Sequence, residues 1–538
     1  MIDVAPEYDV IIIGGGITGA GTARDCAMRG LRTLLIERGD IATGATGRNH
    51  GLLHSGARYA VTDRESAAEC IKENLILKKI ARHCVDDTSG FFLTLPDDDL
   101  DYQKTFVKAC QNAGIKAEVI DPEEARRAEP SVNPAIIGAV RVPDGSVDPF
   151  RLCSSNIVDA KLHGAHVRTY TEVIRLQVRQ DTVEGVEAVD LRTGEKLSFR
   201  GRVIVNACGI WGHHIASLAG VNVGMFPAKG SLLVFAHRVN NIVLNRCRKP
   251  ANADILVPGD TVCVIGTTSD RVRYEECDHL SVTPEEVDLL LGEGMKLAPV
   301  LAQTRVLRAY AGVRPLVSAD NDPSGRNISR GIVCIDHEKR DGLKGFVTIT
   351  GGKLMTYRLM AEQATDMVCR KLHRDIACQT ATTPLPGSEK GGIEKVLKKV
   401  WPTPTLTQKA LLGRAGALAG SLPQEEEAGG SDLVCECEQV SVSEVDVALK
   451  HLDVHTLTDL RRRTRVGMGT CQGELCSCRA AARLARKASD PALARTQARA
   501  FIEERWRGIV PVAWGETLRE ASFTEWVYAE VLGLDDTL

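Results

Sequence analysis

The residues with the clearest chemistry in this sequence are five cysteines near its C-terminus. Cys435 and Cys437 form a C-x-C pair, and the stretch GTCQGELCSCR supplies Cys471, Cys476 and Cys478. Two predicted short helices and a glycine turn separate the pairs, so four thiolates can meet in one site for a soft metal, either zinc or an iron–sulfur cluster. Zinc sites favour C-x2-4-C pairs. The C-x-C spacing therefore leans slightly away from zinc and toward an iron–sulfur cluster, with zinc and a metal-free dithiol centre as alternatives.

A second chemical signal stands at the N-terminus, where YDVIII predicts a buried strand. Gly14, Gly16 and Gly19 follow as G-x-G-x-x-G at the start of a predicted helix, whose free amides can bind a pyrophosphate. Glu37 ends the next predicted strand, where a carboxylate can accept hydrogen bonds from ribose hydroxyls. These features predict a dinucleotide site, and by themselves they do not separate NAD from FAD.

The choice between the two cofactors rests on a distant segment, FVTITGGKLMTYR at 346–358. There Gly351 and Gly352 join an apolar strand to a second predicted helix, whose dipole can stabilise negative charge on a reduced isoalloxazine ring. VIVNACG at 203–209 is typical of a strand that returns to the FAD in two-dinucleotide-domain flavoproteins. Together these segments favour FAD.

Cationic residues beside glycines predict a site for a small phosphate ester. HSGARY places His54, Arg58 and Tyr59 in one loop, and Arg314 lies in YAGVRPL. Arginine suits bidentate phosphate binding. Hydride transfer from an alcohol also needs a group that takes the hydroxyl proton and a cation near the developing alkoxide. We therefore predict His54 and Arg314 as catalytic residues, with His54 as the candidate base.

Length and composition restrict the class of protein. The 538 residues allow several domains, on a prior of roughly 100–200 residues each. A net charge of −3 gives no argument for nucleic acid as a partner. We expect no secretory signal and no spanning helix, because the N-terminus is acidic and no apolar run reaches about 18 residues. The other twelve cysteines are then expected as buried small hydrophobic residues of a cytoplasmic protein.

The sequence pattern predicts an α/β fold with a C-terminal helical domain. Alternating strands and helices continue to about residue 380 after the dinucleotide turn, and a charged, glycine-rich linker with a short helix precedes the cysteines. The predicted boundaries are 1–380 for the oxidoreductase, 381–432 for the linker, 433–490 for the cysteine domain and 491–538 for a tryptophan-rich tail.

Five motifs together resemble the FAD-dependent glycerol-3-phosphate dehydrogenases: GGGITGAG, ATGRNHGLLHSGARY, VNACGIW, AYAGVRPL and TGGKLMTYR. The resemblance implies a discontinuous, glutathione-reductase-like FAD-binding domain and an antiparallel substrate cap, mainly within 85–150 and 215–320. It further implies oxidation of sn-glycerol 3-phosphate to dihydroxyacetone phosphate. It also implies that Arg58, Tyr59, Arg314 and Lys353 surround flavin and substrate, with Arg330 as a further phosphate ligand. One departure is Leu232 in KGSL, where aerobic single-subunit relatives carry a histidine. The identity of the base therefore stays open.

The C-terminal cysteines resemble the bacterioferritin-associated ferredoxin-like [2Fe-2S] domain. Its spacing selects Cys435, Cys437, Cys471 and Cys476 as ligands and leaves Cys478 spare. Within the dehydrogenase family this domain implies the anaerobic type, in which electrons pass to partner subunits B and C and then to a membrane quinone. The resemblance thus implies a cytoplasmic protein that is held peripherally at the inner membrane through its partners.

Several interpretations stay open at this stage. The arginines at 461–463 and 465 form either a solvated face or a positive surface that raises the cluster potential or docks an acidic partner. The tail either packs on its own domain or contributes to a docking surface. RNHGLLHSG also resembles hydroxyglutarate-oxidising flavoenzymes, so another 2-hydroxy compound is a rival substrate. A non-catalytic FAD and iron–sulfur electron-transfer protein is the rival of a different class.

Overall fold

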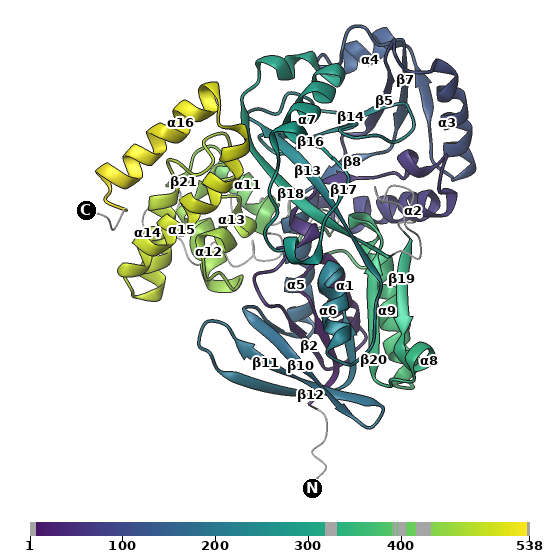
Figure 1. The fold of residues 1–538 in the computed structure, drawn as a ribbon, viewed down its shortest axis with the longest axis vertical. Coiled ribbons are helices and arrows are strands. Elements are labelled where there is room, and N and C mark those ends of the chain that lie inside the picture. The colour runs from purple at the N-terminus through teal and green to yellow at the C-terminus, as the bar shows by residue number, and fades with distance from the viewer. Residues whose placement is uncertain are drawn as a thin grey trace.

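A mainly parallel sheet, drawn at the bottom of Figure 1, is built from strands near the N-terminus together with strands that return from later in the chain. The computed structural model describes residues 7–317, 331–389, 391, 395, 405–415 and 432–534. β1 (Tyr8–Ile13) lies between β2 (Thr33–Ile36) and β12 (Lys196–Asn206), with Ile12 paired to both Leu35 and Val205. β20 (Phe346–Gly351) continues the parallel sheet beyond β12. Both faces of β1 are buried, which explains its unbroken apolar run.

Helices cover one face of this sheet and an antiparallel β-meander covers the other. One core joins β1 to the helices through Val10 and Ile12, and another joins Ile11 and Ile13 to the meander. The covering elements are α1 (Ile17–Met28), α5 (Pro149–Leu162) and α9 (Tyr357–Lys371) on the first face, and β10 (Thr171–Arg179), β11 (Thr182–Asp190) and the first half of β12 on the second. At the sheet edges lie β9 (His166–Arg168), β19 (Ile332–Asp336) and α8 (His337–Asp341). α6 (Gly212–Ser217) packs on the meander side, because Ile215 and Ala216 belong to that core.

The expected antiparallel cap is a second, nine-stranded sheet above the first (Figure 1). Its longest pair is β13 (Met225–Phe235) with β18 (Val306–Val317), and α7 (Pro284–Leu297) packs on it with a shared apolar core. One pairing departs from the antiparallel pattern, because β5 and β14 run parallel. The remaining cap elements are β5 (Gly90–Thr94), β6 (Glu118–Ile120), β7 (Gly138–Val142), β14 (Val243–Arg246), β15 (Ile255–Pro258), β16 (Cys263–Gly266), β17 (Asp270–Arg271), α3 (Leu100–Asn112) and α4 (Pro122–Ala128).

Three short strands and one helix connect the two sheets close to the candidate site described below. They are β3 (Leu52–Leu53), β4 (Val85–Asp86) and β8 (Gly145–Val147), which form a small sheet, and α2 (Arg64–Ile80).

The C-terminal lobe is helical, as the cysteine spacing predicted, and lies beside the cap (yellow-green in Figure 1). Its apolar core includes Phe501 and Tyr528, so the tail and the cysteine segment share one core. Gly467 and Gly473 allow this packing, because a Cβ on either would come within 2.6 Å of the Phe501 ring. The elements are α11 (Leu406–Ala415), β21 (Leu433–Cys435), β22 (Val440–Ser441), α12 (Val442–His451), α13 (Leu457–Thr464), α14 (Ser477–Ala488), α15 (Ala492–Ile509) and α16 (Gly515–Trp526).

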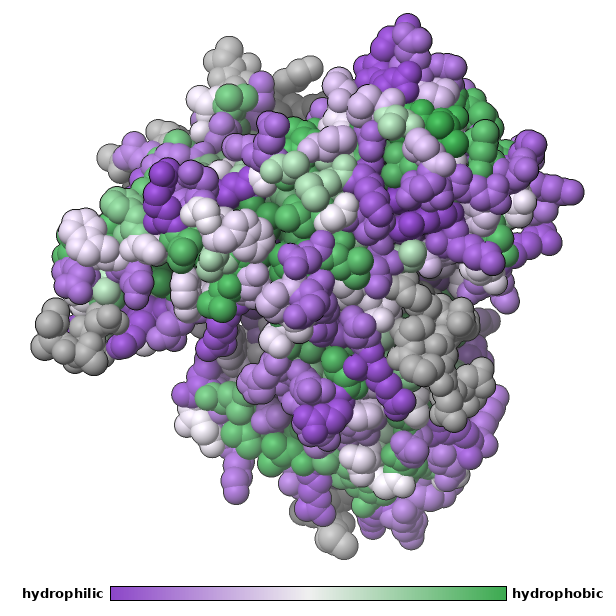
Figure 2. Space-filling view, turned by 45° about the horizontal axis from the view of Figure 1, so that its top comes forward, coloured by the Kyte–Doolittle hydropathy of each residue, from purple (hydrophilic) through white to green (hydrophobic). Residues whose placement is uncertain are grey.

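The surface seen in Figure 2 is largely hydrophilic, with hydrophobic side chains gathered in separate patches. Within the described part of the chain, no helix is both long and apolar enough to cross a membrane.

Candidate functional site

The first glycine motif forms the tight turn that its spacing predicted. Gly14 has φ +113°, and a Cβ there would lie 2.7 Å from the Ala207 carbonyl oxygen. A Cβ on Gly19 would lie 1.9 Å from the carbonyl oxygen of Gly14, so only glycine lets α1 start this close to β1. The Ile17 amide at the helix start donates to Thr46 Oγ1 at 3.0 Å. The turn therefore leaves a helix N-terminus with polar lining, which suits the pyrophosphate of FAD.

Glu37 lies beside this turn, and backbone amides hold its carboxylate. The Gly15 amide donates to Oε2 at 2.6 Å and the Gly39 amide donates to Oε1 at 2.9 Å. Burial raises the pKa of Glu37, and the two amide donors oppose the rise. Each carboxylate oxygen accepts more than one hydrogen bond. The orientation of Glu37 therefore fits the predicted role at a ribose hydroxyl.

The second glycine pair makes a similar turn between β20 and the helical segment that becomes α9. Gly351 and Gly352 have φ of +77° and +64°. A Cβ on Gly351 would meet the Gly331 carbonyl oxygen at 2.4 Å. α9 packs against α1, and the Thr18 hydroxyl contacts Met360 Sδ at 3.8 Å. Two glycine-opened helical segments therefore lie side by side, which fits the extended FAD that the sequence favoured.

Three predicted substrate residues come together above the second turn. Lys353 Nζ lies 4.6 Å from the centre of the Tyr59 ring, and the His54 ring centre lies 5.5 Å from that of Tyr59. His54 is buried. A second histidine, His50, lies 6.1 Å from His54 between ring centres, and nothing beyond its place in RNHG had marked it in the sequence. The two loops that carry the motifs HSGARY and TGGK thus build one polar site.

The arginines of the prediction occupy different positions. Arg314 Nη2 donates to the Thr268 carbonyl at 2.8 Å and also to the Thr267 hydroxyl, so its guanidinium lies against the cap. Gly230 makes room for it, because a Cβ there would lie 2.5 Å from Nη2. Arg58 Nη2 instead pairs with Asp254 at 2.9 Å and donates to the Ala251 carbonyl. In this structure Arg58 therefore joins the motif loop to the cap, and Arg330 lies outside the described residues.

The cysteines are arranged as two pairs of contacting thiols. Cys435 hydrogen-bonds with Cys476, and Cys437 hydrogen-bonds with Cys471. The Cys437 contact lowers the pKa of Cys471 to about 5. Among the described His, Cys, Asp and Glu residues, no group of three or more surrounds a single metal position. Two thiol pairs fit the four-cysteine ligand set of a binuclear [2Fe-2S] cluster.

The surroundings of Cys478 and the backbone amides near Cys435 and Cys471 are consistent with the predicted [2Fe-2S] ligand set. Cys478 lies near the Tyr528 hydroxyl, and burial raises its pKa. The amides of Gly467 and Glu438 hydrogen-bond to Cys435, and those of Gly473 and Leu475 to Cys471. Amide hydrogen bonds to cluster sulfurs help to set the reduction potential. The choice of Cys476 over Cys478 stays a prediction.

The arginine run is not a solvated face, because its members bind carboxylates within the same chain. Arg463 Nη2 pairs with Asp40 Oδ1 at 2.5 Å, with the two side chains 2% and 1% exposed. Arg462 Nη1 adds a second contact to Asp40 at 2.9 Å. Although burial favours the neutral acid, the charges of Arg463 and Arg462 lower the pKa of Asp40. Asp40 follows Glu37 by three residues, so the cysteine domain is anchored next to the predicted ribose site.

Two more arginines extend this anchorage. Arg465 pairs with Asp148 at 3.1 Å and with Asp260 at 3.2 Å, thereby joining the cysteine domain to the flavin domain and the cap. Arg461 pairs with Glu504 at 2.6 Å within the C-terminal lobe. We call the set Arg462, Arg463 and Arg465 the arginine clamp. The acidic partner considered from the sequence is thus found within the same polypeptide.

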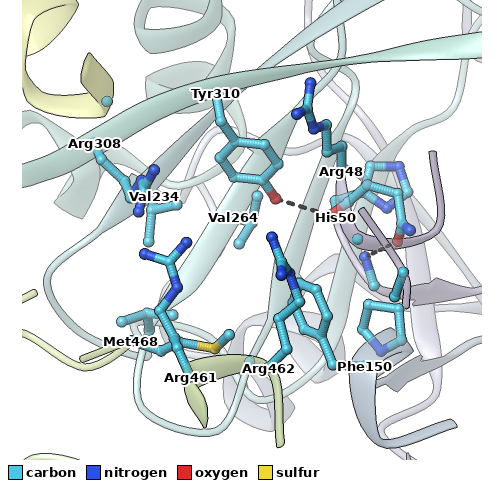
Figure 3. A pocket seen from close by; sticks show the side chains of 18 of the residues that line it. Arg48, His50, Phe150, Val234, Val264, Arg308, Tyr310, Arg461, Arg462 and Met468 are labelled. Carbon is cyan, nitrogen blue, oxygen red and sulfur yellow. Dashed lines mark hydrogen bonds between the residues drawn. The ribbon is translucent and has the colours of Figure 1, made fainter. Parts of the chain in front are cut away.

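A cavity of about 890 Å³ lies where the three parts meet (Figure 3). Arg48 and His50 line it from the flavin-domain loop, Tyr310 from β18, and Arg462 and Met468 from the cysteine domain. The Tyr310 hydroxyl donates to the Asn49 carbonyl at 2.8 Å. Burial and repulsion by Arg462 lower the pKa of Arg48. The cavity therefore separates the loop that leads to His54 from the glycine turn that precedes Cys471.

A dinucleotide-binding sheet, an antiparallel cap and a clamped four-cysteine domain define a flavin oxidoreductase with an iron–sulfur domain. Residues 9–358 match the FAD dependent oxidoreductase family, and residues 433–485 match the BFD-like [2Fe-2S] binding domain. The chain belongs to the family of the anaerobic glycerol-3-phosphate dehydrogenase A subunits. It is 61% identical over 529 residues to the family member of Haemophilus influenzae, covering 98% of this chain and 94% of the relative. The family member of Escherichia coli K12 is also 61% identical, over 98% of this chain and 97% of the relative.

Solved structures agree on the fold. The FAD complex of the glycerol-3-phosphate dehydrogenase from Bacillus halodurans has a TM-score of 0.64 at 21% identity, covering 99% of this chain and 96% of that chain. Glycine oxidase from Geobacillus kaustophilus has a TM-score of 0.57 at 21% identity, covering 71% of this chain and 99% of that chain. The FAD-binding domain, the antiparallel cap and the [2Fe-2S] domain expected from the sequence are confirmed.

The first prediction follows from the close approach of Gly19 to the Gly14 carbonyl oxygen. In Gly19→Ala the added methyl group meets the Gly14 carbonyl, and overpacking of this kind costs roughly 1–3 kcal/mol. FAD affinity is expected to fall about tenfold or more, measured as flavin absorbance per purified chain. Gly292→Ala in α7 is the control, because a Cβ there meets nothing within 4 Å. Full FAD content in Gly19→Ala would contradict the assignment.

The second prediction concerns the two thiol pairs, Cys435 with Cys476 and Cys437 with Cys471. Cys476→Ser is expected to lose the cluster, because it removes one member of a pair, whereas Cys478→Ser should keep it. Iron content and the EPR signal of the dithionite-reduced protein measure both outcomes. Loss of iron from Cys478→Ser with retention in Cys476→Ser would reverse the ligand choice.

The third prediction concerns the contact between the arginine clamp and Asp40. Asp40→Asn leaves Arg463 buried without its counter-charge, which costs about 3–5 kcal/mol. We expect a lower thermal midpoint and slower reduction of the cluster after the flavin is reduced, both followed spectroscopically. Asp181→Asn is the matched control, because its pair with Lys344 is exposed to solvent and contributes little to stability. Equal effects of the two variants would show that the clamp does not position the cysteine domain.

Proposed function

We propose that this protein oxidises sn-glycerol 3-phosphate to dihydroxyacetone phosphate with bound FAD as the hydride acceptor. The observation that carries the proposal is the convergence of His54, Tyr59 and Lys353 at the second glycine turn, where a flavin would meet a small anionic alcohol. The 61% identical relatives are named as dehydrogenases of that substrate, and the similarity extends over 98% of this chain.

The residues of the site divide the work of such a reaction. Lys353 and Arg314 supply positive charge for the phosphate and for the oxygen that loses its proton, with Arg330 as a further phosphate ligand. Arg58 would join them only on exchanging its present partner Asp254 for the phosphate. His54 accepts the hydroxyl proton on an imidazole nitrogen as the C–H bond breaks, and Tyr59 orients His54 and Lys353. The buried position of His54 limits the access of water to the reacting atoms. FAD supplies a two-electron acceptor when it is bound, and the cluster supplies a one-electron acceptor.

The exit of electrons forms the second part of the proposal. The clamp holds the cysteine domain against both the flavin domain and the cap, so the thiols have a defined position relative to the flavin loop. We propose that electrons leave through the cluster to partner subunits B and C and then reach a membrane quinone. The relatives are named as one lettered component of a dehydrogenase, which supports a complex of several chains. In this proposal, attachment to the inner membrane is peripheral and occurs through those partners.

Anaerobic titration with glycerol 3-phosphate tests the activity. We expect the flavin absorbance to bleach and a reduced-cluster EPR signal to follow. His54→Asn should lower kcat about 10²–10⁴-fold, because the proton acceptor is lost, without reducing FAD content. His163→Asn on the exposed end of α5 is the control. If a 2-hydroxy acid such as 2-hydroxyglutarate bleaches the flavin and glycerol 3-phosphate does not, the substrate of this protein is a 2-hydroxy acid. An oxidised flavin with every alcohol would indicate a non-catalytic electron-transfer protein.

A further inference from the structure

Helix α16 has its amphipathic pattern reversed with respect to the molecule. A surface helix normally turns its large apolar side chains toward the core. In α16 the exposed side instead carries Leu518, Phe523 and Trp526, which are 45%, 55% and 56% exposed. The buried side carries small or polar residues at helical spacing, namely Thr517, Ala521 and Thr524. The large side chains of α16 therefore make no contribution to the core beneath the helix.

The exposed apolar side chains of α16 continue onto the neighbouring segments. Trp514 precedes Leu518 by one helical turn, and Val531 follows the helix. We call Trp514, Leu518, Phe523, Trp526 and Val531 the α16 apolar surface. Together with Trp506 on α15, it holds every exposed aromatic residue among the large hydrophobic residues that the structure describes. In Figure 2, green and pale side chains accumulate on this C-terminal lobe, at the left. Aromatic residues are enriched at the energetic centres of protein interfaces.

This surface adjoins the cluster loop. Tyr528, just beyond the end of α16, hydrogen-bonds with Ser477 Oγ at 2.6 Å and donates to the Glu474 carbonyl. Leu475 stands between Cys471 and Cys476 in the sequence and is 59% exposed, although Cys476 itself is buried. The loop that carries Cys471 and Cys476 therefore presents Leu475 on its outer side and is fixed by Tyr528 to the segment between Trp526 and Val531 of the α16 apolar surface. A partner seated there reaches the cluster side of the molecule.

The charges around the surface restrict what covers it. Arg519, the one arginine of α16, is paired with Glu516 at 2.8 Å, so these two charges offset each other, and the exposed Glu525 and Glu530 leave the margin acidic. An acidic margin opposes contact with an anionic membrane, which attracts basic segments instead. It also opposes a second copy that would present the same acidic margin. It suits a protein with an apolar centre and a basic margin.

We propose that the α16 apolar surface is the docking site of an electron-accepting protein that has an apolar centre and a basic margin. A cluster held by the four cysteines would supply one electron at a time to the partner's redox centre across the loop that carries Leu475, with no proton or chemical bond transferred. The inference rests on the proposed exit of electrons through the cluster and adds the surface that receives the acceptor.

The test uses full-length holoenzyme co-expressed with the B and C subunits of its own host. In Phe523→Ser/Trp526→Ser the apolar centre is lost, and the dissociation constant for the B and C subunits should rise about tenfold or more. Dye reduction with glycerol 3-phosphate and the cluster EPR signal should stay unchanged. Val119→Ser/Ile137→Ser is the control, because it removes comparably exposed apolar residues from β6 and from the position before β7, on the far side of the cap from α16 (Figure 1). As a second variant that keeps the apolar centre, Glu525→Lys/Glu530→Lys should weaken binding most at low salt.

Three results would overturn the docking site. Unchanged binding of the B and C subunits by both surface variants would exclude it. Wild-type dimers in sedimentation that dissociate in the serine variant, with binding of B and C intact, would assign the surface to a second copy. Loss of binding to phosphatidylglycerol-containing vesicles alone would assign it to lipid. In each of these cases glycerol 3-phosphate still bleaches the flavin, whereas absence of bleaching in the wild type is the separate failure of the proposed function.

Discussion

The buried contact between Arg463 and Asp40 determines how the two redox domains of this protein are assembled. Burial of a charge is strongly destabilising unless an opposite charge pairs with it. Only the position of the cysteine domain that pairs Arg463 with Asp40 leaves neither of these two buried charges unpaired. Arg465 adds the same requirement toward Asp148 and Asp260. Because Asp40 lies in the turn that follows Glu37, this constraint is coupled to the part of the fold that binds the dinucleotide.

The rest of the architecture follows from two sheets that do different work. The parallel sheet directs α1 and the α9 segment toward one region, where helix dipoles can meet phosphate and reduced flavin. The cap supplies Arg314 from β18, and the motif loop supplies His54 and Tyr59. The arginine-lined cavity then lies between this region and the cysteine domain. A two-electron site and a one-electron site thus occupy one chain, each with its own core.

Local patterns were sufficient where function depends on backbone conformation. Gly14, Gly19 and Gly351 stand where a Cβ would collide with backbone atoms, so their spacing carries a steric requirement that is visible without the fold. The C-x-C pair likewise signals its chemistry through thiol softness and spacing. Side chains that act over long sequence separations were harder to place. The motif HSGARY predicts Arg58 as a phosphate ligand, yet its partner Asp254 is far away in the sequence and lies on the cap.

The sequence by itself determined the dinucleotide turn, the preference for FAD, the antiparallel cap and the [2Fe-2S] domain, because each follows from local sterics, strand periodicity or motif resemblance. Only the tertiary structure decided the partner of the arginine run, which is acidic but belongs to the same chain. It also decided which side of α16 faces outward. A run of charged residues indicates that ion pairs are needed, and helical periodicity indicates that the two faces of a helix differ. The surface that each of them contacts depends on how whole domains pack together, which a local stretch of sequence does not specify.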